Sequence, residues 1–316
     1  MPRYRTEQIL NLDRLKVFLR LDLGVGKEVP GRTADKGPEF TRLSQRIKNL
    51  SQTNSRLKSK ISRKDQEIRN LRMELGATTT SGSQSLSTPL PPKDARPCGP
   101  TQKDDITYLK TADADASRLC DKLGVSPGSS LLDVGCGPGR VAIGLIRRLG
   151  DDLEYHGFDV NSGWLGWAHK NLTPRHPSYR FTHLDVRSDR YNPGGSSLPE
   201  EFAFPIPDSS FDFACLFSVF THMLTDDVRI YLQDFHRVIK PGGRMLVTAF
   251  LEDEVPDVEE NPKGFLGQDW SGPLHCVRYE RAFFYRMLNE AGFELDLEDR
   301  WEDFQRGLYV TRSGSV

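Results

Sequence analysis

The sequence predicts an α/β fold built on a parallel-rich sheet with helices on both faces. Three observations carry this prediction: short apolar runs alternate with helical patterns from residue 105 onwards, a glycine-rich turn follows the first strand, and acidic residues follow several strands. Strands that alternate with helices form parallel sheets, and ligands bind beyond the carboxyl ends of those strands. A region of about two hundred residues is long enough to bury one proper core.

The first strand, residues 131–134, contains Asp133 and runs into Gly135, Gly137 and Gly139. An apolar helix follows at once. Glycines at such a bend let the backbone turn sharply, and they let a ligand lie against bare main chain in front of a helix N-terminus. The spacing is G-x-G-x-G, which differs from the G-x-G-x-x-G that cradles a dinucleotide pyrophosphate.

The second and third strands each end in an acidic residue. Residues 153–158 lead into Asp159, and residues 179–184 lead into Asp185. A carboxylate at the end of the second strand can accept hydrogen bonds from both ribose hydroxyls of an adenosine-type cofactor. Alternatively, Asp159 caps a helix that begins near Gly163, and Asp185 is an ordinary loop residue.

Two further strands complete the predicted parallel core. The fourth covers residues 211–217, and a helix is expected over residues 227–239. The sequence Lys-Pro-Gly-Gly at residues 240–243 stops that helix with a turn. Residues 244–250 then form a fifth, buried strand.

These four motifs, in this order and spacing, resemble the class I S-adenosylmethionine-dependent methyltransferases over about residues 105–312. The resemblance implies a Rossmann-like, seven-stranded sheet with helices on both faces and S-adenosylmethionine as the cofactor. In that family, the carboxylate at the position of Asp185 contacts the adenine amino group, and the next backbone N–H meets a ring nitrogen. The implied cofactor-binding residues are Asp133, Gly135, Gly137, Gly139, Asp159, Asp185, Val186 and Phe217, and no metal ion is implied.

His222 is the candidate catalytic base. The cofactor carries its methyl group on a sulfonium, so transfer depends on a nucleophile that is held close and aligned, and a hydroxyl acceptor also needs a group that takes its proton. His222 lies five residues beyond Phe217, at the end of the fourth strand where the acceptor should approach. The alternative is a histidine that caps or packs against the next helix. Two insertions, residues 187–208 and 252–278, are expected to build the acceptor pocket.

The leading interpretation is therefore a methyltransferase that is O-directed and acts on a small molecule or saccharide. The region from residue 192 to the Lys-Pro-Gly-Gly turn is similar to a bacterial subgroup of small-molecule and sugar methyltransferases. Two alternatives remain open. One is an NAD(P)-dependent oxidoreductase on a similar sheet, and the other is a catalytically silent, methyltransferase-like scaffold that acts through its coiled coil.

The chain divides into four predicted regions. Residues 1–38 suit either a strand or a helix. Residues 39–76 repeat apolar side chains with heptad spacing, which favours a parallel coiled-coil homodimer through residues 40–75. One long amphipathic helix folded back on the enzyme is the alternative. Residues 77–104, rich in Pro, Gly, Ser and Thr, are expected to be a disordered linker, and residues 105–316 form the methyltransferase domain.

The charge and the cysteine content limit the possible substrates and the cellular compartment. Residues 1–76 hold eighteen Lys and Arg against nine Asp and Glu, so the remainder of this chain of net charge −1 is acidic. An acidic catalytic region argues against a nucleic-acid substrate. No apolar run approaches the roughly 20 residues of a membrane span, and no signal peptide is recognised. Five cysteines without metal-type spacing fit reduced thiols, so we expect a cytoplasmic protein.

Overall fold

The computed structural model describes residues 88–97, 99–301 and 305–314. The chain divides into two units at residues 86 and 87, and the described residues belong to the second unit. The predicted N-terminal segment (1–38), the coiled coil (39–76) and the dimer contact at residues 40–75 lie outside the described residues. Within the described part, no helix combines the length and the apolar character needed to cross a bilayer.

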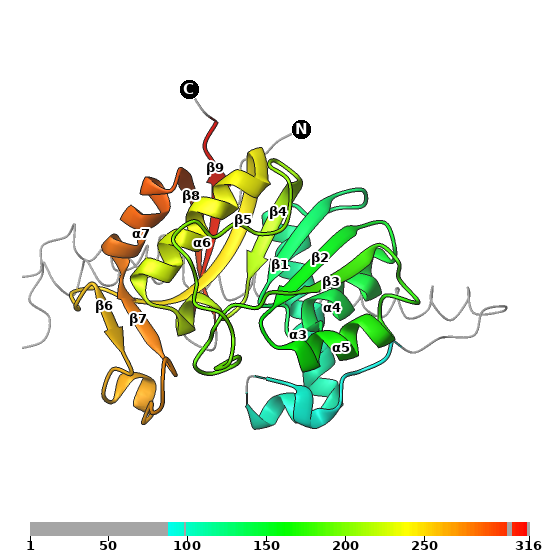
Figure 1. Cartoon of the computed structure of the whole chain (residues 1–316), viewed down its shortest axis with the longest axis horizontal. Coiled ribbons are helices and arrows are strands. Elements are labelled where there is room, and N and C mark those ends of the chain that lie inside the picture. The colour runs from blue at the N-terminus through cyan, green and yellow to red at the C-terminus, as the bar shows by residue number, and fades with distance from the viewer. Residues whose placement is uncertain (1–87, 98, 302–304, 315–316) are drawn as a thin grey trace, which may run out of the picture. The chain divides into compact units, whose positions relative to one another are not determined.

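Five parallel strands form the centre of the sheet (Figure 1). Their order is β3-β2-β1-β4-β5, so the chain reverses direction across the sheet between β1 and β4. This arrangement confirms the predicted parallel core, and it opens a crevice beyond the carboxyl ends of β1 and β4, where the strand order reverses. The strands are β1 (Ser130–Val134), β2 (Glu154–Asp159), β3 (Tyr179–His183), β4 (Phe211–Leu216) and β5 (Ile239–Glu252).

The predicted count of seven strands is wrong, because the described residues contain one sheet of nine strands. The cause is the length of β5. Its middle, from Arg244 to Ala249, pairs antiparallel with β9, while its end, from Phe250 to Glu252, pairs parallel with β7. One edge of β5 therefore pairs with two strands, and the insertion after β5 supplies the two additional strands β6 and β7. The added strands are β6 (Val258–Glu260), β7 (Val277–Glu280), β8 (Phe293–Arg300) and β9 (Arg306–Arg312).

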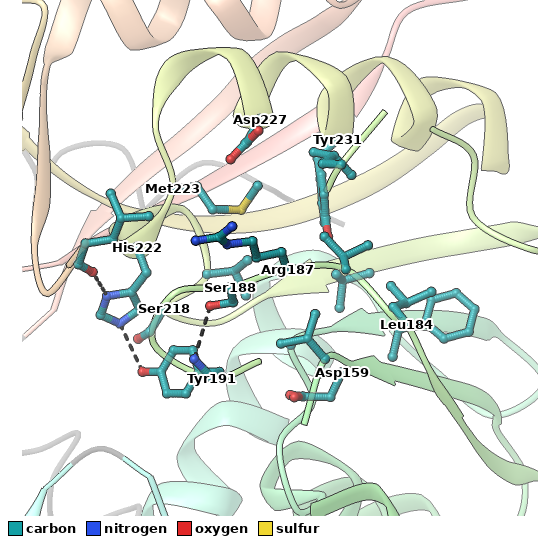
Figure 2. Close-up of a pocket in the computed structure, with 18 of the residues that line it drawn as sticks. Asp159, Leu184, Arg187, Ser188, Tyr191, Ser218, His222, Met223, Asp227 and Tyr231 are labelled. Atoms are coloured by element: carbon teal, nitrogen blue, oxygen red, sulfur yellow. Dashed lines mark hydrogen bonds between the residues drawn. The ribbon is translucent and has the colours of Figure 1, made fainter. Parts of the chain in front are cut away.

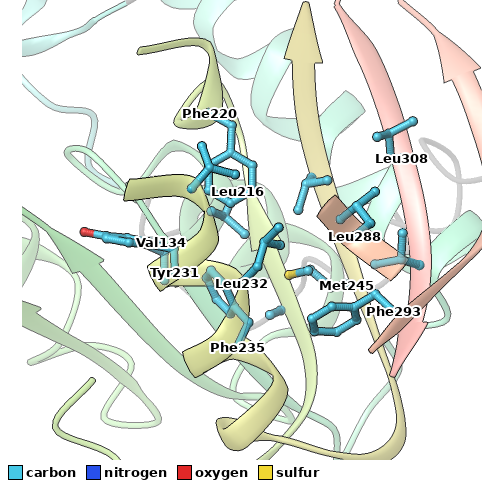
Figure 3. Packing of buried hydrophobic residues seen from close by; sticks show 14 of the residues in the cluster. Val134, Leu216, Phe220, Tyr231, Leu232, Phe235, Met245, Leu288, Phe293 and Leu308 are labelled. Carbon is cyan, nitrogen blue, oxygen red and sulfur yellow. The ribbon is translucent and has the colours of Figure 1, made fainter. Parts of the chain in front are cut away.

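Helices cover both faces of the sheet, as predicted (Figure 1). Strand side chains alternate between the faces: Leu131 packs with α3, α4 and α5, whereas Leu132 packs with α6 and α7. Figure 3 shows Leu232 and Phe235 of α6 against Met245 of β5. The helices are α3 (Asp105–Arg118), α4 (Arg140–Leu149), α5 (Ser162–Asn171), α6 (Thr225–Val238) and α7 (Arg281–Glu290), with short helical turns η1 (Lys93–Ala95), η2 (Pro100–Lys103), η3 (Leu119–Leu123), η4 (Phe220–His222) and η5 (Phe265–Gly267).

The Lys-Pro-Gly-Gly segment ends α6, but it does not form the separate turn that the sequence predicts. It belongs to β5, whose register with β4 shifts between Phe211 and Phe213. Gly242 has a φ of 74°, and a Cβ on Gly243 would lie 2.8 Å from the carbonyl oxygen of Asp212. The segment is therefore an irregularity within a long strand, and glycine is required where the two strands approach closely.

The predicted linker, residues 77–104, is folded in its described part. Pro91 and Arg96 are buried, and the Arg96 guanidinium donates to the carbonyl oxygens of Pro91 (2.9 Å) and Gln102 (3.2 Å). It also pairs with Asp105 at 2.7 Å and lies over the ring of Tyr108. Proline-rich composition predicts a tether because it offers little apolar surface. Here, one arginine holds the segment against α3 instead.

Replacing Arg96 tests this attachment. Arg96→Ala removes a buried cation and leaves two carbonyl oxygens without their donor, so the free energy of unfolding should fall by about 2–4 kcal/mol. The matched control is Lys103→Ala, because Lys103 is exposed and lies 3.7 Å from an exposed Asp94. Chemical denaturation of both variants measures the difference. Equal stability of the two variants would show that the segment does not depend on Arg96.

Candidate active site

A cavity of about 430 Å³ lies beyond the carboxyl ends of β1, β2 and β4 (Figure 2). It has the size of an ordinary small-molecule site. Six of the nine predicted site residues line it, and Asp133, Gly139 and Asp185 do not. The predicted residues in its wall are Gly135, Gly137, Asp159, Val186, Phe217 and His222.

The glycine-rich loop after β1 folds back over the end of β2. The amides of Gly135 and Cys136 both donate to the carbonyl oxygen of Phe158, at 2.7 and 3.0 Å. Gly135 has a φ of 78°, and a Cβ there would lie 2.3 Å from Cγ2 of Val219. Only glycine combines this backbone conformation with so close an approach. The loop therefore presents bare main chain to the cavity directly before α4.

Asp159 is the buried carboxylate of the cavity, with 6 % of its surface exposed. Its Oδ2 accepts from the amide of Gly137 at 2.7 Å, and its Oδ1 accepts from the amide of Asn161 at 2.8 Å. A carboxylate has about four lone-pair sites, and the backbone amides of Gly137, Asn161 and Val160 act on this one, so it keeps the capacity to accept from a ligand. Burial raises the pKa of Asp159, and the backbone amides oppose that shift.

The helix-capping alternative for Asp159 is wrong. The N-cap of α5 is Asn161, whose side chain accepts from the amide of Trp164 at 3.1 Å. Asp159 instead joins the glycine-rich loop to the start of that helix through the backbone amides of Gly137 and Asn161. Its position therefore depends on two segments that both border the cavity.

Asp133 lies behind the glycine-rich loop. It is 1 % exposed and accepts a hydrogen bond of 2.5 Å from the hydroxyl of Tyr155 on β2. Burial raises the pKa of Asp133 to about 7, against the opposing effect of the Tyr155 hydrogen bond. The structure thus gives this residue an internal partner that ties β1 to β2.

Asp185 and Gly139 are also outside the cavity wall. The exposed carboxylate of Asp185 accepts from the hydroxyl of Ser196 at 3.1 Å and from the side-chain amide of Asn192 at 3.4 Å. It therefore organises the first insertion. Gly139 precedes α4, where a Cβ would lie 2.8 Å from Cδ1 of Leu172. Val186 does line the cavity, and its amide donates to the carbonyl oxygen of Leu184 at 2.8 Å.

His222 lies opposite Asp159 at the other end of the cavity (Figure 2). Its Nδ1 is 2.9 Å from the carbonyl oxygen of Leu274, and its Nε2 is 3.5 Å from the hydroxyl of Tyr191. Because a carbonyl oxygen only accepts, Nδ1 carries the proton and Nε2 of the neutral ring carries a lone pair. The pKa of His222 is lowered to about 4, chiefly by burial and to a smaller extent by the charges of Arg190 and His275, while backbone hydrogen bonds with Leu274 and His275 oppose the shift.

Several residues of the cavity wall were not identified from the sequence. Tyr191 and Leu274 come from the two predicted insertions, while Trp164 and Asp227 come from the first turns of α5 and α6. Pro97 comes from the segment that was predicted to be a linker. The insertions themselves were the only available signal, because single aromatic or acidic residues at helix starts carry no distinctive pattern.

The residues at the Asp159 end fit an adenosine-type cofactor. Apolar side chains form a slot beside a buried carboxylate that has free lone pairs, and glycine main chain forms the adjoining wall. Such a slot suits a flat adenine ring, and the carboxylate suits the ribose hydroxyls. The slot residues are Val160, Trp164, Leu184, Val186 and Leu198.

Comparison with known proteins agrees with this geometry. A family model described as a methyltransferase domain matches residues 108–298. A demethylmenaquinone methyltransferase of Lysinibacillus sphaericus is 28% identical over 134 residues, which are 42% of this chain and 50% of that protein. Phosphoethanolamine N-methyltransferase 3 of Arabidopsis thaliana is 25% identical over 203 residues, 64% of this chain and 36% of that protein. The chain thus spans half or less of the length of these relatives.

A solved structure is also similar. The S-adenosylmethionine-dependent methyltransferase from Aquifex aeolicus aligns with a TM-score of 0.43 and 19% sequence identity. The alignment covers 66% of this chain and 99% of that one.

Cofactor binding by Asp159 can be measured directly. S-adenosylhomocysteine should raise the melting temperature by mass action, whereas NADH at the same concentration should not. Asp159→Ala should weaken binding of S-adenosylhomocysteine by about 1.5–3 kcal/mol for each hydrogen bond lost to the charged group. The matched control is Asp151→Ala, since Asp151 is exposed and pairs with His176. Wild-type affinity of Asp159→Ala in a calorimetric titration would remove this residue from the site.

Proposed function

The chain belongs to the methyltransferase family, and we propose that it uses S-adenosylmethionine to methylate a hydroxyl group of an uncharged small molecule or saccharide. The family match excludes the NAD(P)-dependent oxidoreductase that the sequence left open. The acceptor does not follow from the relatives, because their names include both quinone C-methyltransferases and phosphoethanolamine N-methyltransferases.

The observation that carries this proposal is the orientation of His222. Its Nδ1–H is committed to the carbonyl oxygen of Leu274, so the Nε2 lone pair is left for a proton donor. The contact of Nε2 with the Tyr191 hydroxyl is long, at 3.5 Å, and an acceptor hydroxyl can compete with it. A neutral imidazole with this tautomer is suited to accept a proton from a hydroxyl group.

The chemistry explains why a weakly basic histidine suffices. S-adenosylmethionine supplies an electrophilic methyl group. As a neutral hydroxyl oxygen forms its new bond to carbon, its proton becomes strongly acidic, so a base with a pKa of about 4 takes it readily. Before that point, His222 orients the hydroxyl by accepting its hydrogen bond. Positioning of this kind supplies a large part of the acceleration in displacement reactions.

The charges around His222 favour an uncharged acceptor. Arg187 is the one Lys or Arg among the described residues of the cavity wall, and its Nε pairs with Asp189 at 2.9 Å. Asp227 also lines the cavity, and its side-chain carboxyl group makes no hydrogen bond within the described part of the chain; burial raises its pKa. Because Arg187 is paired with Asp189, and Asp159 and Asp227 add two further carboxyl groups, the charged side chains of the described wall carry no net positive charge that would favour a phosphate or carboxylate on the acceptor.

Aromatic side chains in the cavity wall favour a saccharide among the uncharged acceptors. The ring of Tyr191 lies 5.7 Å from that of His222, and the two rings meet edge to face. These rings offer an apolar surface to the C–H face of a sugar, while Asp227 offers acceptor oxygens to hydroxyl groups. The combination of one aromatic side and one carboxylate suits a polyhydroxylated ring.

Substitution of His222 tests the proposed base. His222→Ala should leave affinity for S-adenosylhomocysteine unchanged and lower kcat by about 10²–10⁴-fold. His222→Gln keeps hydrogen bonding but takes no proton, so it should recover little of that loss. Turnover is measured with labelled cofactor against polyol, glycoside and nucleotide-sugar acceptors, and we expect the uncharged acceptors to react. A stable His222→Ala variant with near wild-type kcat would refute the base role.

The pH dependence follows from the lowered pKa. His222 accepts a proton only when it is neutral, which holds above its pKa of about 4. The wild-type kcat should therefore stay level from pH 8 to about pH 5 and decline only near pH 4, whereas an unperturbed histidine would cause a decline near pH 6.5. An amine acceptor would instead give a profile that follows the pKa of the amine and persists in His222→Gln.

A further inference from the structure

The insertion between β5 and β7 folds into a compact loop beside His222. Asn261 closes its base, because its amide donates to the carbonyl oxygen of Cys276 at 2.7 Å and its Oδ1 accepts from the amide of Cys276 at 3.0 Å. The Asn261 side-chain amide also donates to the carbonyl oxygen of Gly272 at 2.8 Å. These bonds place Leu274 within a loop whose two ends are joined.

Both the amide and the carbonyl oxygen of Leu274 are hydrogen-bonded to side chains. Its amide donates to Oε1 of Glu260 at 2.7 Å, and its carbonyl oxygen accepts from Nδ1 of His222 at 2.9 Å. The residue has a φ of 48°, a conformation that costs a leucine free energy and persists only where surrounding contacts enforce it. Glu260 is the side chain that contacts the Leu274 amide directly.

The side chains that neighbour His222 in the described structure do not require one tautomer. The Tyr191 hydroxyl can donate or accept, so it adapts to either state of Nε2. Arg190 donates from Nε to the Tyr191 hydroxyl at 3.1 Å. The backbone of His275, next to Leu274 in the chain, also hydrogen-bonds to the ring and favours its protonated form, as Leu274 does. The Leu274 carbonyl is an acceptor only, and it is therefore the contact that requires a proton on Nδ1.

We propose that Glu260 is a positioning residue for methyl transfer: by holding the Leu274 amide, it aims the Leu274 carbonyl at Nδ1 of His222 and so leaves the Nε2 lone pair facing the acceptor. This inference rests on the proposed function, in which His222 accepts the hydroxyl proton. Glu260 acts from outside the cavity wall, and it touches neither the acceptor nor the cofactor end of the site.

The full chain allows a test that separates positioning from folding. In Glu260→Ala, the Leu274 carbonyl loses its support, so ¹⁵N NMR of His222 should change from the Nδ1–H tautomer to a mixture that contains Nε2–H. We expect kcat to fall about 10- to 100-fold, with unchanged affinity for S-adenosylhomocysteine. Glu260→Gln keeps an acceptor oxygen and should restore most of the activity and the tautomer.

The matched control is the neighbouring residue of β6. Glu259 pairs with Arg278 rather than with the loop, so Glu259→Gln should leave both the tautomer and kcat at wild-type values. Should Glu260→Ala fail to fold, Glu260→Met keeps the side-chain length without an acceptor oxygen and should show the same change of tautomer.

Two outcomes would overturn the inference, and they are distinguishable. If the Glu260 variants keep the Nδ1–H tautomer while His222→Ala still loses kcat, Glu260 does not position His222 and the proposed function stands. If the tautomer changes in Glu260→Ala and kcat does not, the tautomer of His222 is unimportant and the base role fails together with this inference.

Discussion

The hydrogen bond between the Gly137 amide and the Asp159 carboxylate is the contact on which the site depends. It joins the loop after β1 to the end of β2 at 2.7 Å, in a position where the carboxylate is 6 % exposed. A buried carboxylate needs such donors to remain ionised. The amides of Gly137 and Asn161 each use one lone pair of this carboxylate, so the interactions that stabilise the loop leave it able to accept from a ligand, which we propose is the ribose of the cofactor.

The two ends of the cavity have different origins. The Asp159 end, where we propose that the cofactor binds and which we call the cofactor end, is built from strand ends and the loop that directly follows β1, so its geometry follows the register of the sheet. The acceptor end is built from η4 and from two insertions that provide Tyr191 and Leu274. Strand register is rigid, whereas inserted loops vary in length and sequence without disturbing the sheet.

The sequence allowed the cofactor end to be predicted more completely than the acceptor end. Strands buried on both faces are continuous apolar runs, and the glycines and Asp159 follow them within a few residues. The partner of His222, in contrast, is a backbone carbonyl 52 residues further along the chain. Backbone groups leave no signature in the sequence, so neither the tautomer nor the lowered pKa of His222 was predictable.

The folded segment before α3 is a second feature that could not be predicted from the sequence. Its composition correctly indicates little apolar surface, yet Arg96 is buried and hydrogen-bonded, and Pro97 beside it reaches the cavity wall. One buried, fully paired cation can fasten a segment that hydrophobic burial alone would not. Because Arg96 and Pro97 are adjacent, the contact that fastens this segment to α3 also fixes one wall of the cofactor end. The described residues that build the cavity therefore begin before α3, ahead of the point where the strand–helix pattern becomes visible in the sequence.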